Sequence, residues 1–315
     1  MIKSFSANKI ATRDAYGDEI LKLGQANADI FVIDCDIGKS CKTTKFKDEL
    51  PGQYINVGIA EQNACGVAAG LALMGKIPFV TGYAVFGSMR MCEQLRQSVC
   101  YPRLNVKIAC SHGGVTPAND GATHQCVEDM GILRTIPNMT VIMGADYFAT
   151  RALVRAAAEC YGPVYLRFTR DEVPGIYSEN DTFEIGKAKL LSEGSELTII
   201  ANGDTLSVAI EAANTLKAKG KSVRLLDMHT IKPLDVEAVR AAVRDTGKII
   251  TVEDHSIING LGSAVCEIAA ETGNCIVKRI GVQDCFGESA PYEELLRKNG
   301  ITSESIVEAA YRFSA

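Results

Sequence analysis

The polar segment SHGGVTPANDGATHQCVED, residues 111–129, contains the residue types of a binding or catalytic loop. It carries Asp120 and two of the chain's four histidines, His112 and His124. Imidazole and carboxylate groups bind hydroxyl-rich ligands and move protons near neutral pH, and the glycines allow tight backbone turns. The alternative is a solvated loop whose histidines cap helices. We favour a site, because two histidines, an aspartate and a glycine-rich backbone occur together.

Glu61 stands in the segment YINVGIAEQNACGVAAGLA, residues 54–72. A strand-like run ends at Gly58, and a helix rich in alanine and glycine follows. Acids at helix N-termini are stabilised by the helix dipole and often cap the helix. The neighbouring residues offer Glu61 no basic partner, so a desolvated carboxylate here would have a raised pKa and could share a proton with a ligand nitrogen. The residues alone leave both roles open.

Tyr83, Phe86 and Met89 are spaced three apart in TGYAVFGSMRMCEQLRQSV, residues 81–99. Such spacing places side chains on one side of a helix, which usually indicates core packing. A platform on which a planar ligand ring stacks is the functional alternative, but the spacing alone favours the core. The chain contains no GxGxxG after a strand, no P-loop, no HExxH and no GxSxG. The familiar nucleotide-binding loops are therefore disfavoured.

Short β-branched runs alternate with helical patterns, which predicts parallel sheets covered by helices on both faces. Strands are predicted at 30–35, 54–57, 77–82, 105–110, 139–144, 163–168, 197–202, 222–228, 248–253 and 275–280. Helices are predicted at 12–25, 87–99, 127–134, 147–160, 205–219, 235–244 and 260–272, with a helical tail from 292 and again from 303. A polar linker with Pro and Gly occupies 171–192. We expect an α/β fold with two doubly wound, mostly parallel domains at 1–185 and 186–315.

Composition excludes several classes of protein. The 315 residues include 33 basic and 38 acidic side chains without a basic patch, which argues against a nucleic-acid partner. Eleven scattered cysteines without a CxxC pair favour reduced thiols over a disulfide scaffold or a zinc site. No secretion signal is visible, and the longest apolar stretch, 64–75, is too short to span a bilayer. We therefore expect a soluble cytoplasmic protein with no membrane partner.

The sequence resembles the C-terminal half of a transketolase, in which a pyrimidine-binding domain precedes a C-terminal domain. The motifs that carry the resemblance occur in the same order with suitable gaps: ATRDAYGDEIL at 11–21, GIAEQ at 58–62, DGATHQ at 120–125, LRTIPNM at 133–139 and DMHTIKPLD at 227–235. The resemblance runs from residue 11 to the end of the chain. It implies a pyrimidine-binding domain at 1–185 and a transketolase C-terminal domain at 186–315.

The resemblance also implies a thiamine diphosphate cofactor and transfer of a two-carbon ketol unit between sugar phosphates. Glu61 and His124 would be the catalytic residues, with Glu61 on the aminopyrimidine and His124 near the reacting carbonyl. The residues expected to bind the cofactor are Glu61, Tyr83, Phe86, Met89 and Asp36, although Met89 stands where transketolases often have a further aromatic ring. The residues expected to bind the substrate are Arg13, Ser40, His112, Asp120, His124 and Arg170. Four of these match the phosphate end of the substrate, namely Arg13, Ser40, His112 and Arg170, and a guanidinium fork suits that task.

A complete transketolase has a further N-terminal domain, whose GDG…N motif holds the diphosphate and Mg²⁺, Ca²⁺ or Mn²⁺. This sequence contains no such motif in a suitable context. The resemblance therefore implies half of a site, no metal ligand in this chain, and an N-terminal partner subunit in an α2β2 assembly. The start at Met1 favours a natural split subunit over a fragment.

Three alternatives compete with this interpretation. A 1-deoxyxylulose-5-phosphate synthase shares DGxTHQ but usually has Asp-Arg where this chain has Ser111-His112-Gly113. The beta subunit of a 2-oxo-acid dehydrogenase first component has the same domain layout but lacks the DGATHQ loop. A non-catalytic paralogue would have lost catalytic positions. The intact positions, which favour a catalytic transketolase, are Glu61, His112, Asp120 and His124.

Overall fold

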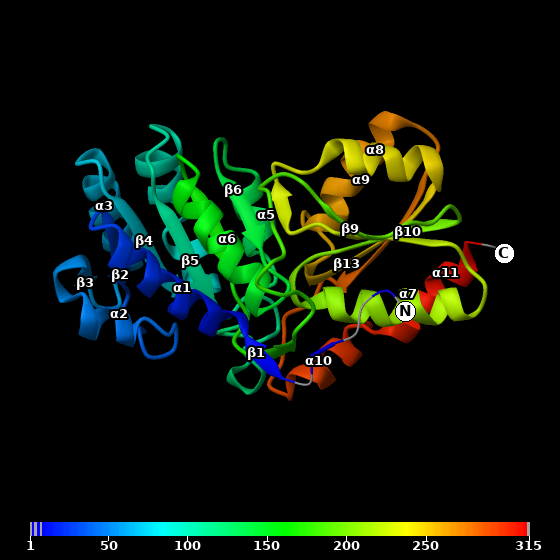
Figure 1. Ribbon diagram of the computed structural model, residues 1–315, viewed down its shortest axis with the longest axis horizontal. Coiled ribbons are helices and arrows are strands. Elements are labelled where there is room, and N and C mark those ends of the chain that lie inside the picture. Colours follow the sequence, from blue (N-terminus) through cyan, green and yellow to red (C-terminus); the bar gives the residue numbers. More distant parts are fainter. Residues whose placement is uncertain (1, 3–4, 7, 314–315) are drawn as a thin grey trace.

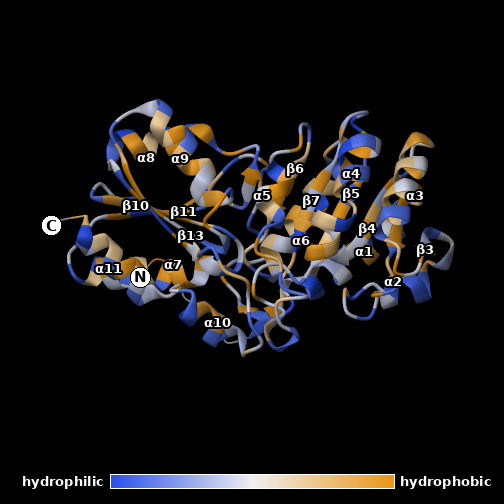
Figure 2. Cartoon of the chain, turned by 180° about the vertical axis from the view of Figure 1, so that it is seen from behind, coloured by the Kyte–Doolittle hydropathy of each residue, from blue (hydrophilic) through white to orange (hydrophobic). Residues whose placement is uncertain are grey.

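The computed structural model describes residues 2, 5–6 and 8–313, and these form two α/β domains that lie side by side (Figure 1). The predicted fold class is confirmed. The first domain lies on the left of Figure 1, mostly in blue to green, and the second on the right, mostly in yellow-green to red. Hydrophobic residues concentrate on the strands and on the helix faces that cover them (Figure 2).

The first domain is built on a seven-stranded sheet in the order β12-β6-β7-β5-β4-β2-β3, parallel except for β12. Its strands are β2 (Ile30–Asp34), β3 (Tyr54–Asn56), β4 (Ile77–Tyr83), β5 (Lys107–Ser111), β6 (Thr140–Met143), β7 (Val164–Arg167) and β12 (Thr230–Lys232). Its helices are α1 (Thr12–Ala26), α2 (Thr44–Glu49), α3 (Glu61–Leu73), α4 (Cys92–Gln94), α5 (Asp129–Arg134) and α6 (Tyr147–Glu159). Short 3-10 turns occur at η1 (Pro51–Gln53) and η4 (Ala118–Asp120).

Alternate residues of the central strands pack into different hydrophobic clusters, as the two-residue period of a strand requires. Ile108 of β5 clusters with Ala64 and other residues of α3, whereas the next residue, Ala109, clusters with Tyr16 of α1 and Leu153 of α6. Helices therefore cover both faces of the sheet, as predicted.

The second domain has a five-stranded sheet in the order β14-β13-β10-β11-β9, parallel except for β9. Its strands are β9 (Lys189–Ser192), β10 (Leu197–Ala201), β11 (Val223–Asp227), β13 (Lys248–Ser256) and β14 (Ile276–Val282). Its helical elements are η5 (Gly203–Thr205), α7 (Leu206–Ala218), α8 (Val236–Asp245), α9 (Leu261–Thr272), α10 (Tyr292–Lys298) and α11 (Ser303–Arg312). In Figure 1, α8 and α9 lie above this sheet, and α7 and α11 lie below it.

Short edge strands are where the sequence-based prediction was wrong. The linker expected at 171–192 contains β8 (Glu172–Pro174), which pairs antiparallel with β1 (Lys9–Ala11), and it also contains β9. β12 was missed as well, although it completes the sheet of the first domain by pairing with β6. Three- and four-residue strands carry too few residues for a two-residue period to be detected.

The helix predicted at 87–99 is also corrected by the structure. The segment forms two π-helical turns, η2 (Phe86–Arg90) and η3 (Leu95–Cys100), separated by α4. The wide turn is closed by the N–H of Met91, which donates to the carbonyl oxygen of Phe86. Such π-helical turns frequently occur at functional sites.

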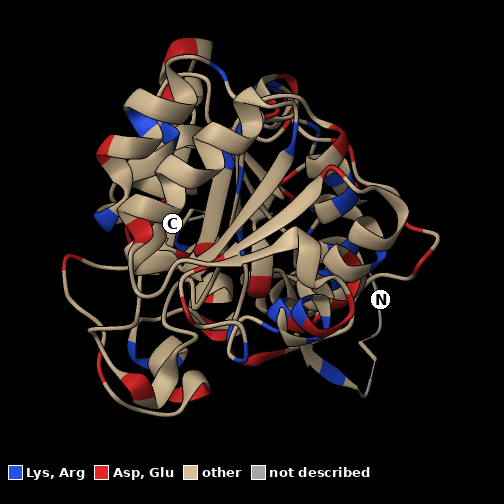
Figure 3. Cartoon of the chain, turned by 90° about the vertical axis from the view of Figure 1, so that its left-hand side faces the viewer, with Lys and Arg blue, Asp and Glu red and all other residues tan. Residues whose placement is uncertain are grey.

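Surface charge and hydropathy are unremarkable in the part of the chain that the structure describes. Basic and acidic residues are interspersed over the side of the first domain (Figure 3). None of the described helices combines the length and the apolar character needed to cross a membrane. All eleven cysteines are free thiols, as the scattered spacing predicted.

Candidate active site

Four of the predicted site residues lie at or after the carboxyl ends of four neighbouring parallel strands. Asp36 follows β2, and Glu61 follows β3 as the first residue of α3. Tyr83 is the last residue of β4, and His112 follows β5 directly. Open α/β sheets bind their ligands at this edge. The fold therefore brings together residues that are up to 76 positions apart, from 36 to 112.

Four rings form a cluster at this edge. The centroid of Tyr83 lies 4.0 Å from that of His112 and 5.9 Å from that of His124. The centroid of Phe86 lies 6.2 Å from those of Tyr83 and His124. The two histidines of the polar loop thus lie against Tyr83, at the end of β4, and His124 also lies against Phe86 of η2.

None of the three residues spaced three apart is fully buried, so the core packing favoured by their spacing is wrong. Tyr83 and Phe86 are half-buried, and Met89 is 41% exposed. A π-helical turn at the end of a strand replaces the regular helix that the spacing assumed. The two aromatic rings therefore remain accessible at the edge of the sheet.

His112 is a buried, neutral imidazole. It is 2% exposed, and its backbone has a φ of 68°, the left-handed region that non-glycine residues rarely adopt. Burial, with the positive charges of Arg13 and Arg170, lowers the pKa of His112 to about 3. Its Nδ1 hydrogen-bonds the Ser111 hydroxyl at 2.7 Å. His112 therefore acts at neutral pH as an uncharged hydrogen-bonding group.

Basic residues gather beside this ring cluster. The Nη1 atom of Arg13 donates to the carbonyl oxygen of Ser40 at 3.1 Å, and the Ser40 side chain hydrogen-bonds Tyr83. Arg170 Nε lies 3.5 Å from a carboxylate oxygen of Asp120. Polar contacts thus link Arg13, Ser40 and Tyr83 in one group and Arg170 with Asp120 in another.

A hollow of about 860 Å³ adjoins this basic group, and both Arg13 and Arg170 line it. The other basic residues that line it are Lys9 and Lys42. The acids that line it are Asp14, Asp18, Asp171, Glu172 and Glu293. Arg13 and Arg170 are thus the two guanidinium groups that this hollow offers to an anionic ligand end.

Asp36 stands apart from the ring cluster. It is exposed, has a φ of 66°, and accepts a hydrogen bond from Asn56 Nδ2 at 2.9 Å. The hydrogen bond joins the ends of the neighbouring strands β2 and β3, since Asp36 follows β2 and Asn56 ends β3. A left-handed non-glycine residue at this position points to a functional constraint on the turn.

Glu61 has a basic partner that the local sequence does not reveal. It is 3% exposed, and Arg90 Nη1 donates to its two carboxylate oxygens at 3.0 and 2.9 Å. The guanidinium carbon of Arg90 also lies 4.3 Å from the centroid of the Phe86 ring. The basic partner that the sequence neighbours of Glu61 do not offer comes from η2, which folds back over the start of α3. No sequence pattern could have shown this, since the two residues are 29 positions apart.

The second domain holds the base of the histidine-bearing loop. Both carboxylate oxygens of Asp254, in β13, accept the N–H of Val115, at 3.1 and 3.0 Å. Arg167 Nη2 donates to the carbonyl oxygens of Asp254 and Cys126, at 2.9 and 3.0 Å. Burial and the neighbouring charge of Asp204 raise the pKa of Asp254 well above its usual range. Asp254 thus fixes the loop from the other domain.

The next two residues of β13 hold the far end of the same loop. His255 Nε2 accepts the N–H of Gly131 at 3.1 Å, and the N–H of Ser256 donates to the carbonyl oxygen of Val127 at 2.7 Å. Sequence reasoning missed these residues. The polar run EDHS that ends an apolar strand at 253–256 was the signal that could have found them.

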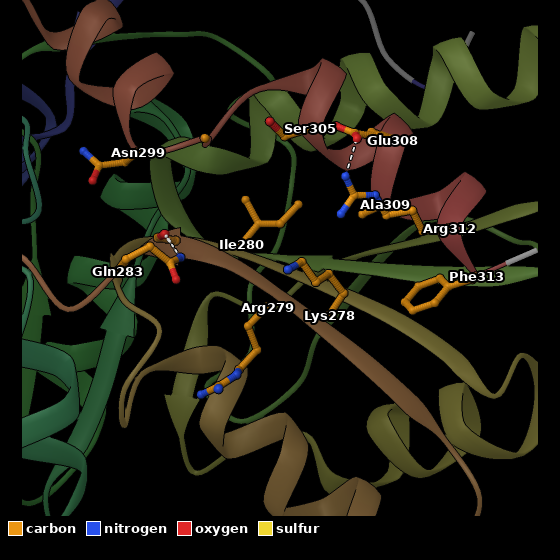
Figure 4. Close-up of a pocket in the computed structure, with 12 residues that line it drawn as sticks. Lys278, Arg279, Ile280, Gln283, Asn299, Ser305, Glu308, Ala309, Arg312 and Phe313 are labelled. Carbon is orange, nitrogen blue, oxygen red and sulfur yellow. Dashed lines mark hydrogen bonds and ion pairs between the residues drawn. The ribbon is translucent and has the colours of Figure 1, made fainter. Parts of the chain in front are cut away.

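A separate hollow of about 320 Å³ lies in the second domain, beside β14 and α11 (Figure 4). Lys278 and Arg312 reach toward it, and Arg312 is paired with Glu308. None of the predicted site residues lines this hollow. Among the described residues, no group of three or more His, Cys, Asp or Glu is arranged to hold a metal ion.

The chain thus has two α/β domains, and an acid, two aromatic rings and two histidines gather at one edge of the first sheet. Both domains match families of known proteins. The family model "Transketolase, pyrimidine binding domain" matches residues 8–175, and "Transketolase, C-terminal domain" matches residues 186–306. The chain belongs to the transketolase family. The exact division expected at residue 185 stays a prediction.

Several relatives match almost the whole chain. A "Putative transketolase C-terminal section" of Methanocaldococcus jannaschii is 45% identical over 297 residues, 93% of each chain. One of the subunits of an apulose-4-phosphate transketolase, from Phocaeicola vulgatus, is 42% identical over 308 residues, 97% of this chain and 98% of that protein. A solved structure described as "Split gene transketolase, inactive beta4 tetramer" superimposes with a TM-score of 0.88 at 45% identity, covering 97% of this chain and 98% of that one.

Full-length transketolases match this chain over only half of their length. The transketolase of Rattus norvegicus is 37% identical over 306 residues, which are 96% of this chain but 49% of the rat protein. The structure of the transketolase from Leishmania mexicana superimposes with a TM-score of 0.84 at 25% identity and is covered to 47%.

Proposed function

We propose that this chain is the C-terminal subunit of a two-subunit transketolase, which transfers a two-carbon ketol unit from a ketose phosphate to an aldose phosphate with thiamine diphosphate as cofactor. The observation that carries the proposal is the meeting of Glu61, the Tyr83 and Phe86 rings, and both loop histidines at one edge of the sheet. Relatives named as separate sections or subunits, and matched over nearly their whole length, support the split arrangement.

The residues of this edge fit an aminopyrimidine. A planar, hydrogen-bond-donating group already lies between the Glu61 carboxylate and the Phe86 ring, namely the guanidinium of Arg90. The space therefore accepts a flat nitrogen-containing group that bonds to one residue and stacks on the other. Bound thiamine diphosphate would supply the electron sink for two-carbon transfer.

Three groups of this chain would bind that cofactor. Glu61 would share a proton with a pyrimidine ring nitrogen, since its carboxylate is buried and the group that it binds, the Arg90 guanidinium, also lies over the Phe86 ring. Phe86 and Tyr83 would provide the stacking faces, with Met89 at the exposed rim. Asp36 would bound the site on the side of β2 and β3.

The loop and the basic group would bind the sugar phosphate. His112 would hydrogen-bond sugar hydroxyl groups as a neutral imidazole, because its pKa is about 3. His124 would reach the reacting carbonyl, where it would hold or move a proton. Asp120 would accept a bond from a substrate hydroxyl. The groups proposed for the phosphate end are Arg13, Ser40 and Arg170.

The remaining half of the site would come from a partner subunit. An N-terminal transketolase subunit would hold the diphosphate and a Mg²⁺, Ca²⁺ or Mn²⁺ ion, in an α2β2 assembly. This assignment is supported by the half-length match to full transketolases.

Reconstitution tests the proposal. The chain would be purified alone and with its N-terminal partner subunit, and each sample would be assayed with thiamine diphosphate and Mg²⁺ on a panel of ketose phosphate donors and aldose phosphate acceptors. We expect ketol transfer only from the mixture. Full activity of the chain alone would contradict the split site. Inactivity of the mixture on every donor would contradict the assignment as a transketolase.

A further inference from the structure

We propose that Arg90 is a built-in competitor for the pyrimidine site. In the free chain its guanidinium closes over Glu61 and Phe86, and it must withdraw for the cofactor to bind. This inference rests on the proposed function, because the group that displaces Arg90 is the aminopyrimidine assigned above.

The contacts of Arg90 duplicate the two contacts assigned to the cofactor. Its Nη1 atom donates to the two carboxylate oxygens of Glu61 at 3.0 and 2.9 Å. Its guanidinium carbon stands 4.3 Å from the centroid of Phe86, the distance of a stacked planar group. A pyrimidine that bonded Glu61 and stacked on this face of Phe86 would occupy the same space. The two groups therefore exclude each other.

The burial of the pair shows which partner can move. The side chain of Glu61 is 4% exposed, whereas that of Arg90 is 46% exposed. Arg90 is the last residue of η2, so its long side chain starts at the rim of the site. Rotation of this side chain toward solvent leaves the backbone and the acid in place. Glu61 is thus a fixed group, and Arg90 is a mobile one that covers it.

The pairing has a clear physical role in the free chain. A buried carboxylate without a partner is strongly unfavourable, and Arg90 supplies that partner until a ligand does. The consequence is a lowered cofactor affinity, because the apparent dissociation constant is the intrinsic one divided by the fraction of open molecules. If about nine molecules in ten are closed, the affinity falls about tenfold.

Calorimetric titration of the assembled two-subunit protein with thiamine diphosphate and Mg²⁺ tests the inference. Arg90→Ala removes the competitor, and we expect its dissociation constant to be about tenfold lower than that of the unaltered protein. Arg90→Lys keeps a charge that can pair with Glu61 but cannot lie flat on Phe86, so its affinity should fall between the two. Arg96→Ala is the matched control, since it removes an exposed arginine from the same segment and should leave the affinity unchanged.

The outcomes separate the two proposals. If the unaltered protein does not bind thiamine diphosphate, the proposed function fails. If it binds, and Arg90→Ala binds equally or more weakly, the competitor role is overturned and Arg90 is a supporting cofactor ligand instead. If the Ala variant does not fold, the Lys variant takes its place: a lower dissociation constant than that of the unaltered protein supports the competitor role, and an equal or higher one overturns it. A crystal structure of the loaded protein provides a second measurement, in which Arg90 should no longer contact Glu61.

Discussion

The guanidinium of Arg167, in β7 of the first domain, donates to the backbone carbonyl oxygen of Asp254, in β13 of the second, at 2.9 Å. The Asp254 carboxylate in turn accepts the N–H of Val115, at the base of the loop that carries Asp120 and His124. The second domain contributes no predicted site residue, yet it fixes the backbone from which the substrate-binding groups would project.

Gly114→Ala tests this support. Gly114 has a φ of 63°, and an added Cβ would lie 2.0 Å from a carboxylate oxygen of Asp254. Gly220→Ala is the control, because its φ of 82° is equally unfavourable but open space surrounds its Cβ. We expect the control to lose about 1–2 kcal/mol of unfolding free energy in urea. Gly114→Ala should lose about 1–3 kcal/mol more, through overpacking, and should raise the KM for sugar phosphates. Equal losses would show that Asp254 does not constrain the loop.

Glu61→Gln tests the proposed acid. We expect kcat of the two-subunit enzyme to fall by about 10²–10⁴, since the amide cannot share a proton in the same way. Glu93→Gln, an exposed acid on the neighbouring helix α4, should retain full activity. Thermal unfolding of both variants would check the fold. An active Glu61→Gln enzyme would refute the role of this residue.

Phe86→Ala and Met89→Ala test the stacking platform. The titration is best done in an Arg90→Ala background, so that loss of the Arg90–Phe86 contact does not contribute. We expect the Phe86 change to raise the dissociation constant of thiamine diphosphate about tenfold, through the lost ring contact. The change at the exposed Met89 should raise it less than about threefold. The reverse order would move the platform from Phe86 to Met89.

His112→Gln tests the neutral imidazole by its effect on stability at low pH. The pKa of His112 is about 3 in the folded chain and about 6.5 when unfolded, so unfolding takes up a proton between these values. This contribution is fully present above pH 6.5 and is lost as the pH falls toward 3. From pH 7 to 5 the unaltered chain should therefore lose roughly 1–2 kcal/mol more unfolding free energy than the Gln variant. The buried acids titrate alike in both proteins and cancel in the difference. Parallel curves would show that folding does not lower the pKa of His112.

Arg170→Met tests the phosphate end. We expect the KM for a phosphorylated acceptor to rise about 10–100-fold, as for the loss of a charge-assisted hydrogen bond. The unphosphorylated form of the same sugar provides the control, because it should react equally with both proteins. A similar rise in KM for both sugars would show that Arg170 does not bind the phosphate and acts instead by holding Asp120 in position.

The sequence predicted the fold class and most of the strands, because buried parallel strands are continuous apolar runs bounded by turns. It also indicated the loop of His112 and His124, since glycine and imidazole are conspicuous between apolar elements. Arg90 could not be predicted, because its contact with Glu61 depends on a π-helical turn folding back over another helix. Asp254 escaped notice for a similar reason, since a polar residue at a strand end gains its meaning from the domain packed against it.

β12 has a consequence for the integrity of the first domain. Thr230 and Lys232 pair with Ile142 and Val141 of β6, so the edge of the first sheet is closed by residues that follow the boundary expected at 185. A chain cut at that boundary would expose the backbone N–H and C=O groups of β6 as an open edge, which favours strand pairing between molecules. The sheet of the first domain is therefore complete only when the chain continues past that boundary, at least as far as Lys232.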